Sequence, residues 1–573
     1  MTDPVRQVRE LTPAQFAIAL AVLVLIGAVL RGLFPAADPP WQSTVGIVWH
    51  DEGAWLHNAR NRALFGVWSL DAWNPMFVAP VFTFLEYLSF ATFGVGVRQA
   101  RLVPEVLGLA SAVLIGLGVA RLAGRRAGLI AAALLATNYV YVMWNRAALM
   151  EAPMAAFMVA SWYCTTRAER STRWAWGAAT FALLAFFTKA AAAFFVAALA
   201  IDAVAALVLG WNRSPDRRRY GIAMLAALTV CGSLALVLFV LPNWTDYWFY
   251  NVQMSVTRKP TYDLPSLLNR VTWFPILHDL FTRMWLELGL GLAAAFTLAF
   301  RFREAQAGER LLVWWLALGT LELLLHDVGN ERRFVFFIPA LIALAAIVLG
   351  RERALLPPAV SRISRSQALL AAPVVAYALY VLFGAAVRLA FLYDVRPNVR
   401  MAAGAAALLT IAIYVTWPRV PRALSSSPWS PGAGLVLAAV LAAGQVMQYV
   451  QWANGRTYKN YEASRALADA LPPGTLVHGK LANGLSLENR IKPVFVGRGF
   501  GNYEDRGLRD DVRYILTYIV PSVGYESQKT NPVIQDVLDA YPSHTIIMTF
   551  DVAETATGHD RAALIDKFGR EEN

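Results

Sequence analysis

Long apolar runs alternate with short polar segments along the first 450 residues of the chain. The first run, residues 14–34, carries no charge before Arg31 and is long enough for a helix to cross about 30 Å of hydrocarbon. It exceeds the apolar core of a removable signal peptide, so we expect a membrane-spanning helix. Similar runs lie at 102–120, 127–143, 151–166, 174–189, 190–210, 221–241, 284–300, 311–326, 334–349, 368–390, 401–417 and 432–450. The pattern predicts a mostly α, polytopic membrane protein with about 13 transmembrane helices.

The composition agrees with this class and excludes others. Hydrophobic residues make up 57% of the 573 residues and charged ones 16%, which excludes a disordered chain and is too apolar for a soluble enzyme. Both cysteines, Cys164 and Cys231, lie in apolar runs, so neither a disulfide scaffold nor a structural zinc site is expected. The net charge of +12 comes from arginines grouped between the apolar runs. This grouping favours membrane topology over nucleic-acid binding as their cause.

The apolar run from Phe77 to Val97 is ambiguous, because it could cross the membrane or lie along its surface. The positions of the arginine groups decide between the two, and with that decision the topology is set. If this run stays outside the bilayer, the arginine groups all share the side of the N-terminus, as the positive-inside rule requires. The groups are Arg121/Arg125/Arg126, Arg167/Arg170/Arg173, Arg213/Arg217/Arg218/Arg219, Arg301/Arg303/Arg310, Arg351/Arg353/Arg362/Arg365 and Arg419/Arg422. We therefore expect a cytoplasmic N-terminus and external juxtamembrane helices in the first loop, with Glu86 at the membrane interface. The first loop and the tail after Val450 are then external.

The tail is polar and differs in character from the rest. Segments 474–480, 493–497, 512–520 and 544–550 are short apolar strand candidates, while 461–471 and 533–541 are helix candidates. This alternation predicts a small extracytoplasmic α/β domain at 451–573, beside a transmembrane catalytic domain at 1–450. The tail contains no phosphate-binding glycine loop and no nucleophile elbow. A structural or acceptor-guiding module is the interpretation that remains.

Two adjacent carboxylates, Asp51 and Glu52, precede an amphipathic stretch in the first external loop. Neighbours in a helix point about 100° apart, so only one of the pair can face a given target. One interpretation is a general base, Asp51, next to a residue that orients its partner. The other is that both simply stabilise a helix N-terminus through the helix dipole.

Further charged residues lie near the expected outer edge of the membrane. A charged side chain is costly there, so each one requires a structural or functional explanation. Arg146 and Glu151 flank one loop and either bind substrate or pair with each other or with headgroups. Lys189 ends the run 174–189 and either meets a phosphate or extends to the interface as a helix-end lysine. Arg332 and Arg333 run against the positive-inside trend, which makes them candidates for an anion such as a lipid phosphate, with ordinary headgroups as the alternative.

The order of these motifs resembles the GT-C glycosyltransferases, and most closely the branch of protein O-mannosyltransferases and lipid A aminoarabinose transferases. The resemblance covers roughly Val45–Val196 and rests on the Asp51-Glu52 pair, the Arg146…Glu151 step, the Thr-Lys at Lys189, and Asn-Pro followed by an apolar helix and Arg101. Glu151 stands where the family often has Asp. Trp73-Asn74-Pro75-Met76 stands in place of the Lys-Pro-Pro step of the aminoarabinose transferases.

What the resemblance implies is transfer of a sugar from a polyprenyl-phosphate-linked donor to an acceptor hydroxyl at the outer face, with inversion at the anomeric carbon. Asp51 matches the family's catalytic acid residue and would be the general base. Glu52 would orient the acceptor or Asp51. Arg146, Glu151, Lys189, Arg332 and Arg333 would form the substrate-binding set, its cations stabilising the leaving phosphate.

Other partners and alternatives complete the expectation. The acceptor is a lipid, a glycan or a protein, the location is the plasma (inner) membrane, and no nucleic acid is involved. No cofactor is assigned, although a divalent metal bridging Asp51 or Glu151 to the phosphate stays open. A transporter or flippase of lipid-linked sugars, and a lipid-linked oligosaccharide ligase or polymerase, are the competing functions. A transporter would place polar groups near the bilayer midplane.

Overall fold

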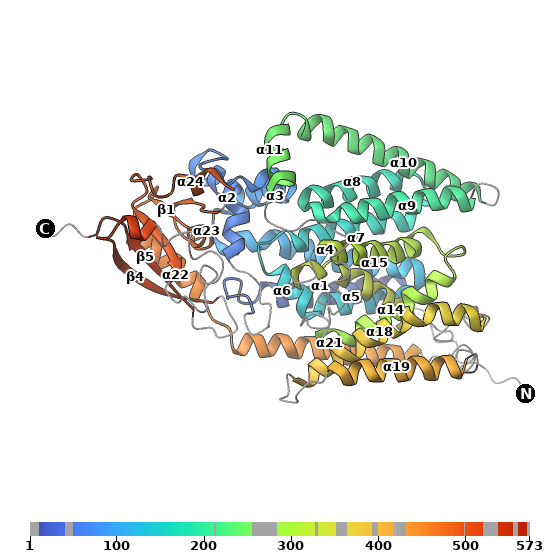
Figure 1. Cartoon of the computed structure of the whole chain (residues 1–573). Helices are drawn as coiled ribbons and strands as arrows, with labels where there is room; N and C mark the ends of the chain where they lie inside the picture. The colour runs from blue at the N-terminus through green and yellow to red at the C-terminus, as the bar shows by residue number, and fades with distance from the viewer. Residues whose placement is uncertain are drawn as a thin grey trace, which may run out of the picture.

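In the computed structural model, long helices run side by side and a small group of strands lies beyond one end of them (Figure 1). The structure describes residues 11–40, 50–210, 214–254, 283–326, 331–350, 364–391, 399–417, 419, 431–497, 499–518, 537–553 and 560–569. The long apolar helices are α1 (Pro13–Gly32), α4 (Val97–Ala123), α5 (Arg125–Thr137), α6 (Tyr139–Asn145), α7 (Glu151–Ala168), α8 (Arg173–Thr188), α9 (Ala193–Gly210), α10 (Pro215–Ala235), α14 (Trp285–Phe300), α15 (Ala307–His326), α16 (Phe337–Leu349), α18 (Arg365–Phe391), α19 (Val399–Val415) and α21 (Pro431–Asn454). Every apolar run of the sequence is thus helical.

Length and composition alone single out fewer of these as spans. Among the described residues, five helices are long and apolar enough to cross a membrane, or up to six if the bent pair α5 and α6 is one span. Helices α14, α16 and part of α19 are apolar but shorter. The chain is a multi-pass helical protein, and about 13 spans stays a prediction.

Local sequence explains where the first helix begins. The Thr12 hydroxyl oxygen accepts a hydrogen bond from the amide of Gln15, and the Gln15 side-chain oxygen accepts one from the amide of Thr12. Pro13 occupies the first helical position. This capping box satisfies amides that would otherwise lack partners at the edge of the apolar run. The helix then continues through uncharged residues to Arg31.

Between α5 and α6 the chain bends by 59°, and polar side chains satisfy the backbone that the bend releases. Asn138 Oδ1 accepts from the amide of Tyr141 at 2.9 Å, and Gln445 Oε1 accepts from the amide of Tyr139 at 2.9 Å. Such breaks are tolerated inside a bundle only when other groups replace the lost helical hydrogen bonds. Residues 146–150 then join α6 to α7.

Helix α3 (Pro80–Phe93) begins and ends at the same end of the bundle. Asp71, ahead of it, accepts from the amide of Phe495 at 2.9 Å, and Val97, after it, donates to Glu488 Oε1 at 2.8 Å. Both partners belong to the C-terminal strands and helices. The chain before α3 and the chain after it therefore lie at the same end of the bundle, the end that carries these strands. This agrees with the expectation that Phe77–Val97 does not cross.

Glu86, which the sequence analysis places at the membrane interface, faces the protein interior. Its side chain is fully buried against protein, on the face of α3 that carries Phe82 and Phe90. Burial raises the pKa of Glu86 well above its usual value, and the nearby Glu52 carboxylate raises it further. A raised pKa favours the neutral acid, which costs less to bury than the carboxylate.

Among the described residues, the arginine-rich turns near 121–126, 217–219 and 301–303 gather at the other end of the helices, whereas Arg213, Arg351, Arg353, Arg362 and Arg422 lie outside the described residues. Arg125 donates to the carbonyl of Leu11 beside the start of α1, and Arg121 donates to the carbonyl of Thr166 near the end of α7. Arg217 donates to the carbonyl of Arg303 at 2.7 Å. These contacts place the arginine-rich turns around the N-terminal end of α1, away from the C-terminal strands (Figure 1).

The C-terminal unit, residues 459–569, folds around a mixed sheet. Its elements are α22 (Lys459–Ala470), β1 (Leu476–His478), α23 (Lys480–Gly484), β2 (Lys492–Val494), α24 (Gly501–Glu504), β3 (Tyr514–Tyr518), β4 (Thr545–Val552) and β5 (Asp560–Asp566). The strand order is β2-β1-β3-β5-β4, with β2, β1 and β3 parallel and β5 antiparallel to both β3 and β4. Leu467, Val477 and Leu516 pack on one face, and Ile515 and Ile565 on the other.

Each of the four predicted strands is present, and the predicted helix at 461–471 corresponds to α22. Of the second predicted helix, 533–541, residues 537–540 are helical, and residues 533–536 lie outside the described residues. Strand β5 was not predicted, because its run of Ala562, Ala563 and Leu564 favours a helix by local propensity. Pairing with β3 and β4 overrides that preference. Helix α21 continues to Asn454, past the expected boundary at Gln451.

A buried ion pair joins helices at the arginine-rich end. Arg310 at the start of α15 donates to Asp202 of α9 through Nε at 2.8 Å and Nη2 at 3.3 Å, and to Glu169 through Nη1 at 3.0 Å. Tyr220 of α10 donates to the same Asp202 at 2.7 Å. The Asp202 and Arg310 side chains are both fully buried, so each needs the other to avoid an isolated charge.

We therefore expect Asp202→Ala to destabilise the protein by about 3–5 kcal/mol, because it leaves the Arg310 guanidinium buried without its main partner. Thermal unfolding of the purified protein in detergent measures this. The control is Asp216→Ala, whose ion pair with Arg219 is largely exposed and should change stability by less than about 0.5 kcal/mol. Equal unfolding temperatures for the two variants would contradict the assignment.

Candidate functional site

Four charged side chains from separate segments meet at the end of the bundle that bears the C-terminal unit. Asp51 lies in the first turn of α2 (His50–Phe65), Glu151 is the first residue of α7, Lys189 follows the last residue of α8, and Arg332 lies in η7 (Glu331–Phe334). Apolar helices bring these polar ends together, because a charge at a helix end can leave the hydrocarbon while its helix remains inside.

Arg332 is the centre of this cluster. Its Nη1 donates to Asp51 Oδ2 at 2.7 Å, and its Nε lies 3.5 Å from Glu151 Oε1. Lys189 Nζ donates to the same Glu151 oxygen. One continuous chain of opposite charges therefore links Asp51, Arg332, Glu151 and Lys189.

Access differs within the cluster. The Glu151 side chain is 2% exposed, whereas those of Asp51, Lys189 and Arg332 are 13%, 14% and 18% exposed. Glu151 is thus the buried counter-ion, and the other three side chains are partly exposed. Within the part of the chain that the structure describes, nothing donates a hydrogen bond to Oε2 of Glu151.

Lys189 lies in the turn between α8 and α9, outside both helices. Burial lowers its pKa to about 8, the Glu151 carboxylate opposes that shift, and Arg332 and Arg333 add to it. Arg333 is therefore near enough to act on Lys189 electrostatically, and it belongs to the same positive region. A lysine with a pKa near 8 is mostly charged at neutral pH and loses its charge in mildly alkaline solution.

Glu52 points away from this cluster. Its two carboxylate oxygens accept from Arg101 Nε at 2.9 Å and Nη2 at 2.8 Å, and Oε1 also accepts from the amide of Ala148 at 2.8 Å. Arg101 in addition donates to the carbonyls of Pro35 and Ala37. Glu52 therefore connects α2 to α4 and to the loop that precedes Glu151, and its contacts support a positioning role rather than one of holding the acceptor.

Arg146 does not join the cluster either, and it does not pair with Glu151. It lies over the C-terminal end of α1, where it donates to the carbonyls of Arg31, Leu33 and Phe34 and stacks over the Trp452 ring at 4.7 Å. The last carbonyls of a helix lack intrahelical donors and carry partial negative charge, which a guanidinium satisfies. The guanidinium is thus hydrogen-bonded to the protein backbone, and its role as a substrate ligand stays a prediction.

Sequence reasoning assigned no role to Arg101, which holds Glu52, or to Asp71 and Trp73, which hold α2 in place. Arg101 belonged to the motif that carries the resemblance, but nothing in the sequence shows that its partner lies 49 positions away. In the described ranges, no group of three or more His, Cys, Asp or Glu side chains is placed to hold a metal ion.

Comparison with known proteins shows which proteins the chain resembles. Residues 77–240, a range that includes Glu151 and Lys189, match the family model described as dolichyl-phosphate-mannose-protein mannosyltransferase. The structure of ArnT from Cupriavidus metallidurans in the apo state superposes with a TM-score of 0.52 at 16% identity, covering 97% of this chain and 99% of that one. A search of curated protein sequences finds no match.

Two further solved structures are similar at lower scores. ArnT from Cupriavidus metallidurans bound to undecaprenyl phosphate has a TM-score of 0.49 at 16% identity, over 97% of this chain and 98% of that chain. The oligosaccharyltransferase AglB from Archaeoglobus fulgidus has a TM-score of 0.43 at 13% identity, over 94% and 73%. The ArnT match in the apo state and the family match together confirm the resemblance: the chain has the fold of the GT-C membrane glycosyltransferases.

The two arginines of the predicted binding set should respond differently to substitution. We expect Arg146→Ala to lower the thermal unfolding temperature while leaving the affinity for a lipid phosphate within about twofold, because it removes a helix cap. Arg332→Ala should weaken that affinity at least about tenfold, because it removes a charge-assisted contact. Binding of polyprenyl phosphate by the purified variants measures both. Strong loss of affinity in Arg146→Ala alone would return Arg146 to the binding set.

Proposed function

We propose that this protein is an integral membrane glycosyltransferase that moves a sugar from a polyprenyl-phosphate-linked donor to an acceptor hydroxyl at the outer face of the plasma (inner) membrane. The observation that carries the proposal is the cluster of Asp51, Glu151, Lys189 and Arg332 at one end of the helices. The matching family, whose description names a dolichyl-phosphate-mannose donor, supports the same donor class. The acceptor is a lipid, a glycan or a protein.

Asp51 is the proposed general base. It is a partly exposed carboxylate whose Oδ2 accepts from Arg332. A donor phosphate competes for that guanidinium, so donor binding frees Asp51 to accept the proton of the acceptor hydroxyl as the hydroxyl oxygen attacks the anomeric carbon. A carboxylate at hydrogen-bond distance contributes about 10²–10⁴-fold to such a step. Glu52, through Arg101 and Ala148, keeps the Asp51-bearing turn in register with the loop before Glu151.

The proposed phosphate ligands are Lys189, Arg332 and Arg333. Together with Asp51 and Glu151 they form a set of three cations and two carboxylates, which leaves one positive charge for a phosphate to neutralise. The sugar–phosphate bond breaks as the polyprenyl phosphate leaves with a growing negative charge. Cations already in place stabilise this charge in the transition state more than in the ground state. A single displacement in line with the leaving phosphate inverts the anomeric carbon.

The distribution of charge favours an enzyme over a transporter. A transporter of lipid-linked sugars needs polar groups near the middle of the bilayer. In this chain the candidate ligands lie at helix ends on the side of the C-terminal unit, and the arginine-rich turns lie at the opposite end. The positive-inside rule then assigns the arginine-rich end to the cytoplasm and the cluster to the outer face.

Asp51→Asn should lower the rate of sugar transfer at least about 10²-fold, because the amide cannot accept the proton. The assay is release of polyprenyl phosphate from a polyprenyl-phosphate sugar by the purified protein. Asp216→Asn, in an exposed ion pair remote from the cluster, is the matched control and should retain full activity. An Asp51→Asn protein as active as this control would contradict the assignment of the base.

Lys189 predicts a specific pH dependence. Because burial lowers the pKa of Lys189 to about 8, the side chain loses its charge above that pH and the KM for the donor should rise. Lys189→Arg should remove the rise, since the guanidinium stays charged throughout. Lys189→Ala should raise the KM at every pH, with a smaller effect on kcat. A donor KM that is unchanged in Lys189→Ala would reduce Lys189 to a residue that only stabilises the helix end.

A further inference from the structure

The C-terminal unit touches the turn of α2 that carries Asp51. Gly53 packs so closely against α23 that a Cβ placed on it would lie 1.8 Å from the carbonyl oxygen of Asn483 and 3.1 Å from the Cα of Gly484. Both contacts are to backbone, which cannot move aside as a flexible side chain can. The residue two positions after Asp51 therefore fixes how near α2 and the C-terminal unit approach.

Trp73 forms a second connection to the same turn. Its indole Nε1 donates to the carbonyl of Ala54 at 2.7 Å, one helical turn after Asp51. Its ring stacks on Phe495, with centroids 4.6 Å apart and planes at 20°, and meets Phe500 edge-on at 5.1 Å. Both phenylalanines belong to the C-terminal unit. The indole thus connects that unit to the backbone of the first turn of α2.

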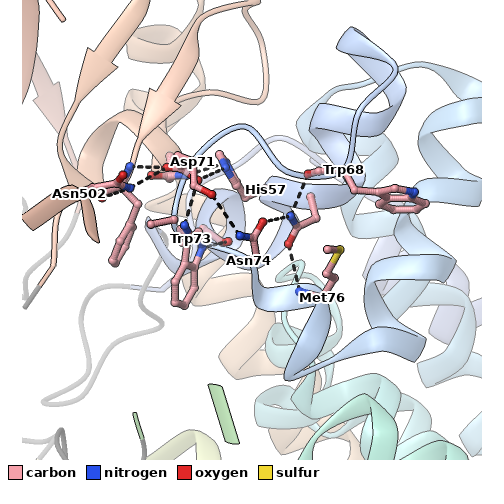
Figure 2. Close-up of polar contacts among 12 residues, drawn as sticks. His57, Trp68, Asp71, Trp73, Asn74, Met76 and Asn502 are labelled. Atoms are coloured by element: carbon pink, nitrogen blue, oxygen red, sulfur yellow. Dashed lines mark hydrogen bonds and ion pairs between the residues drawn. The ribbon is translucent and has the colours of Figure 1, made fainter. Parts of the chain in front are cut away.

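Asp71 holds Trp73 in this position. Figure 2 shows its carboxylate between α2 and the C-terminal unit, and its side chain is only 4% exposed. It accepts from the amides of Trp73 at 3.0 Å and Phe495 at 2.9 Å, and from Asn502 Nδ2 at 3.3 Å. His57 Nε2 lies 2.9 Å from the same carboxylate. A buried carboxylate with this many donors is strongly held, so it resists displacement.

The far part of α2 is also attached to the C-terminal unit. Arg60 is fully buried and donates to the carbonyls of Ser486 at 3.0 Å, Asn489 at 2.9 Å and Ile491 at 3.0 Å. His57 Nδ1 lies 3.0 Å from Asn483 Nδ2. Contacts along the whole helix, rather than at one point, therefore hold α2 to this unit.

From these contacts we infer that the C-terminal unit positions Asp51: α23 against Gly53, together with Phe495 and Phe500 through Trp73, sets the orientation of the turn from which Asp51 reaches Arg332. The unit is then part of the scaffold of the active site, and Asp71, Trp73 and Gly53 are positioning residues. This inference rests on the proposed function for its effect on rate. Small displacements of a reacting group are costly, since an error of about 1 Å lowers rate about 10²-fold.

Gly53→Ala tests the inference sharply. In an unobstructed helix this change stabilises the helix, because alanine is the better helix former. Here the added methyl must push α2 away from α23. The matched control is Gly232→Ala in α10, where a Cβ would meet nothing within 4 Å. Trp73→Phe is the second variant, because it keeps an aromatic ring next to Phe495 but removes the donor to Ala54.

Hydrogen exchange of the amides in residues 50–58 reports the position of the turn whether or not the reaction is assigned correctly. For the full-length protein in detergent we expect Gly53→Ala and Trp73→Phe to raise exchange in this peptide about tenfold, and Gly232→Ala to leave it unchanged. Unchanged exchange in both site variants would overturn the inference.

Measurement of turnover in the same variants then distinguishes a failure of this inference from a failure of the proposed function. We expect kcat to fall about 10–10²-fold in Gly53→Ala, with the KM for the donor nearly constant, because Lys189 and the phosphate ligands do not move. Faster exchange with a lower kcat supports both the positioning and the role of Asp51. Faster exchange with an unchanged kcat supports the connection to the C-terminal unit and contradicts Asp51 as the base.

Discussion

The arrangement of the candidate site depends on one interaction, the pairing of Arg332 with carboxylates from two different helices. Its guanidinium donates to Asp51 of α2 and lies next to Glu151 of α7, while Lys189 neutralises Glu151 from the other side. No two of these four groups are close in sequence. Each would be costly to bury alone at the edge of a membrane, so their mutual attraction and the packing of the helix ends reinforce each other.

A division of roles within the charged residues follows from burial and partners. Glu52 accepts hydrogen bonds from Arg101 and from the amide of Ala148, and Arg146 donates to the carbonyls at the end of α1. Both residues therefore hold backbone segments in register. Asp51, Lys189 and Arg332 keep exposed surface. This separation suits catalysis by preorganised charge, because the held groups keep the backbone fixed while only the contact between Arg332 and Asp51 has to change when a donor binds.

Much of this architecture could be predicted from the sequence, and the failures have clear physical reasons. Apolar runs specify helices locally, and the excess of arginine on one side specifies which ends lie together, so the gathering of Glu151 and Lys189 at one end followed from topology. The partners of Arg146 and Glu52 could not be predicted in this way. Arg146 contacts the end of α1 and Glu52 contacts Arg101, and these groups, distant in sequence, become neighbours only through packing. Strand β5 was missed because sheet pairing overrode the helix propensity of its alanines.

The most direct test is an experimental structure of the protein with a polyprenyl phosphate bound. The account predicts that the phosphate lies within hydrogen-bond distance of Lys189 and Arg332, and that Arg332 has exchanged its contact with Asp51 for a phosphate oxygen. Asp51 would then face open space beside the phosphate. A phosphate bound at the arginine-rich end, or one bound elsewhere while Asp51 and Arg332 remain paired, would contradict it.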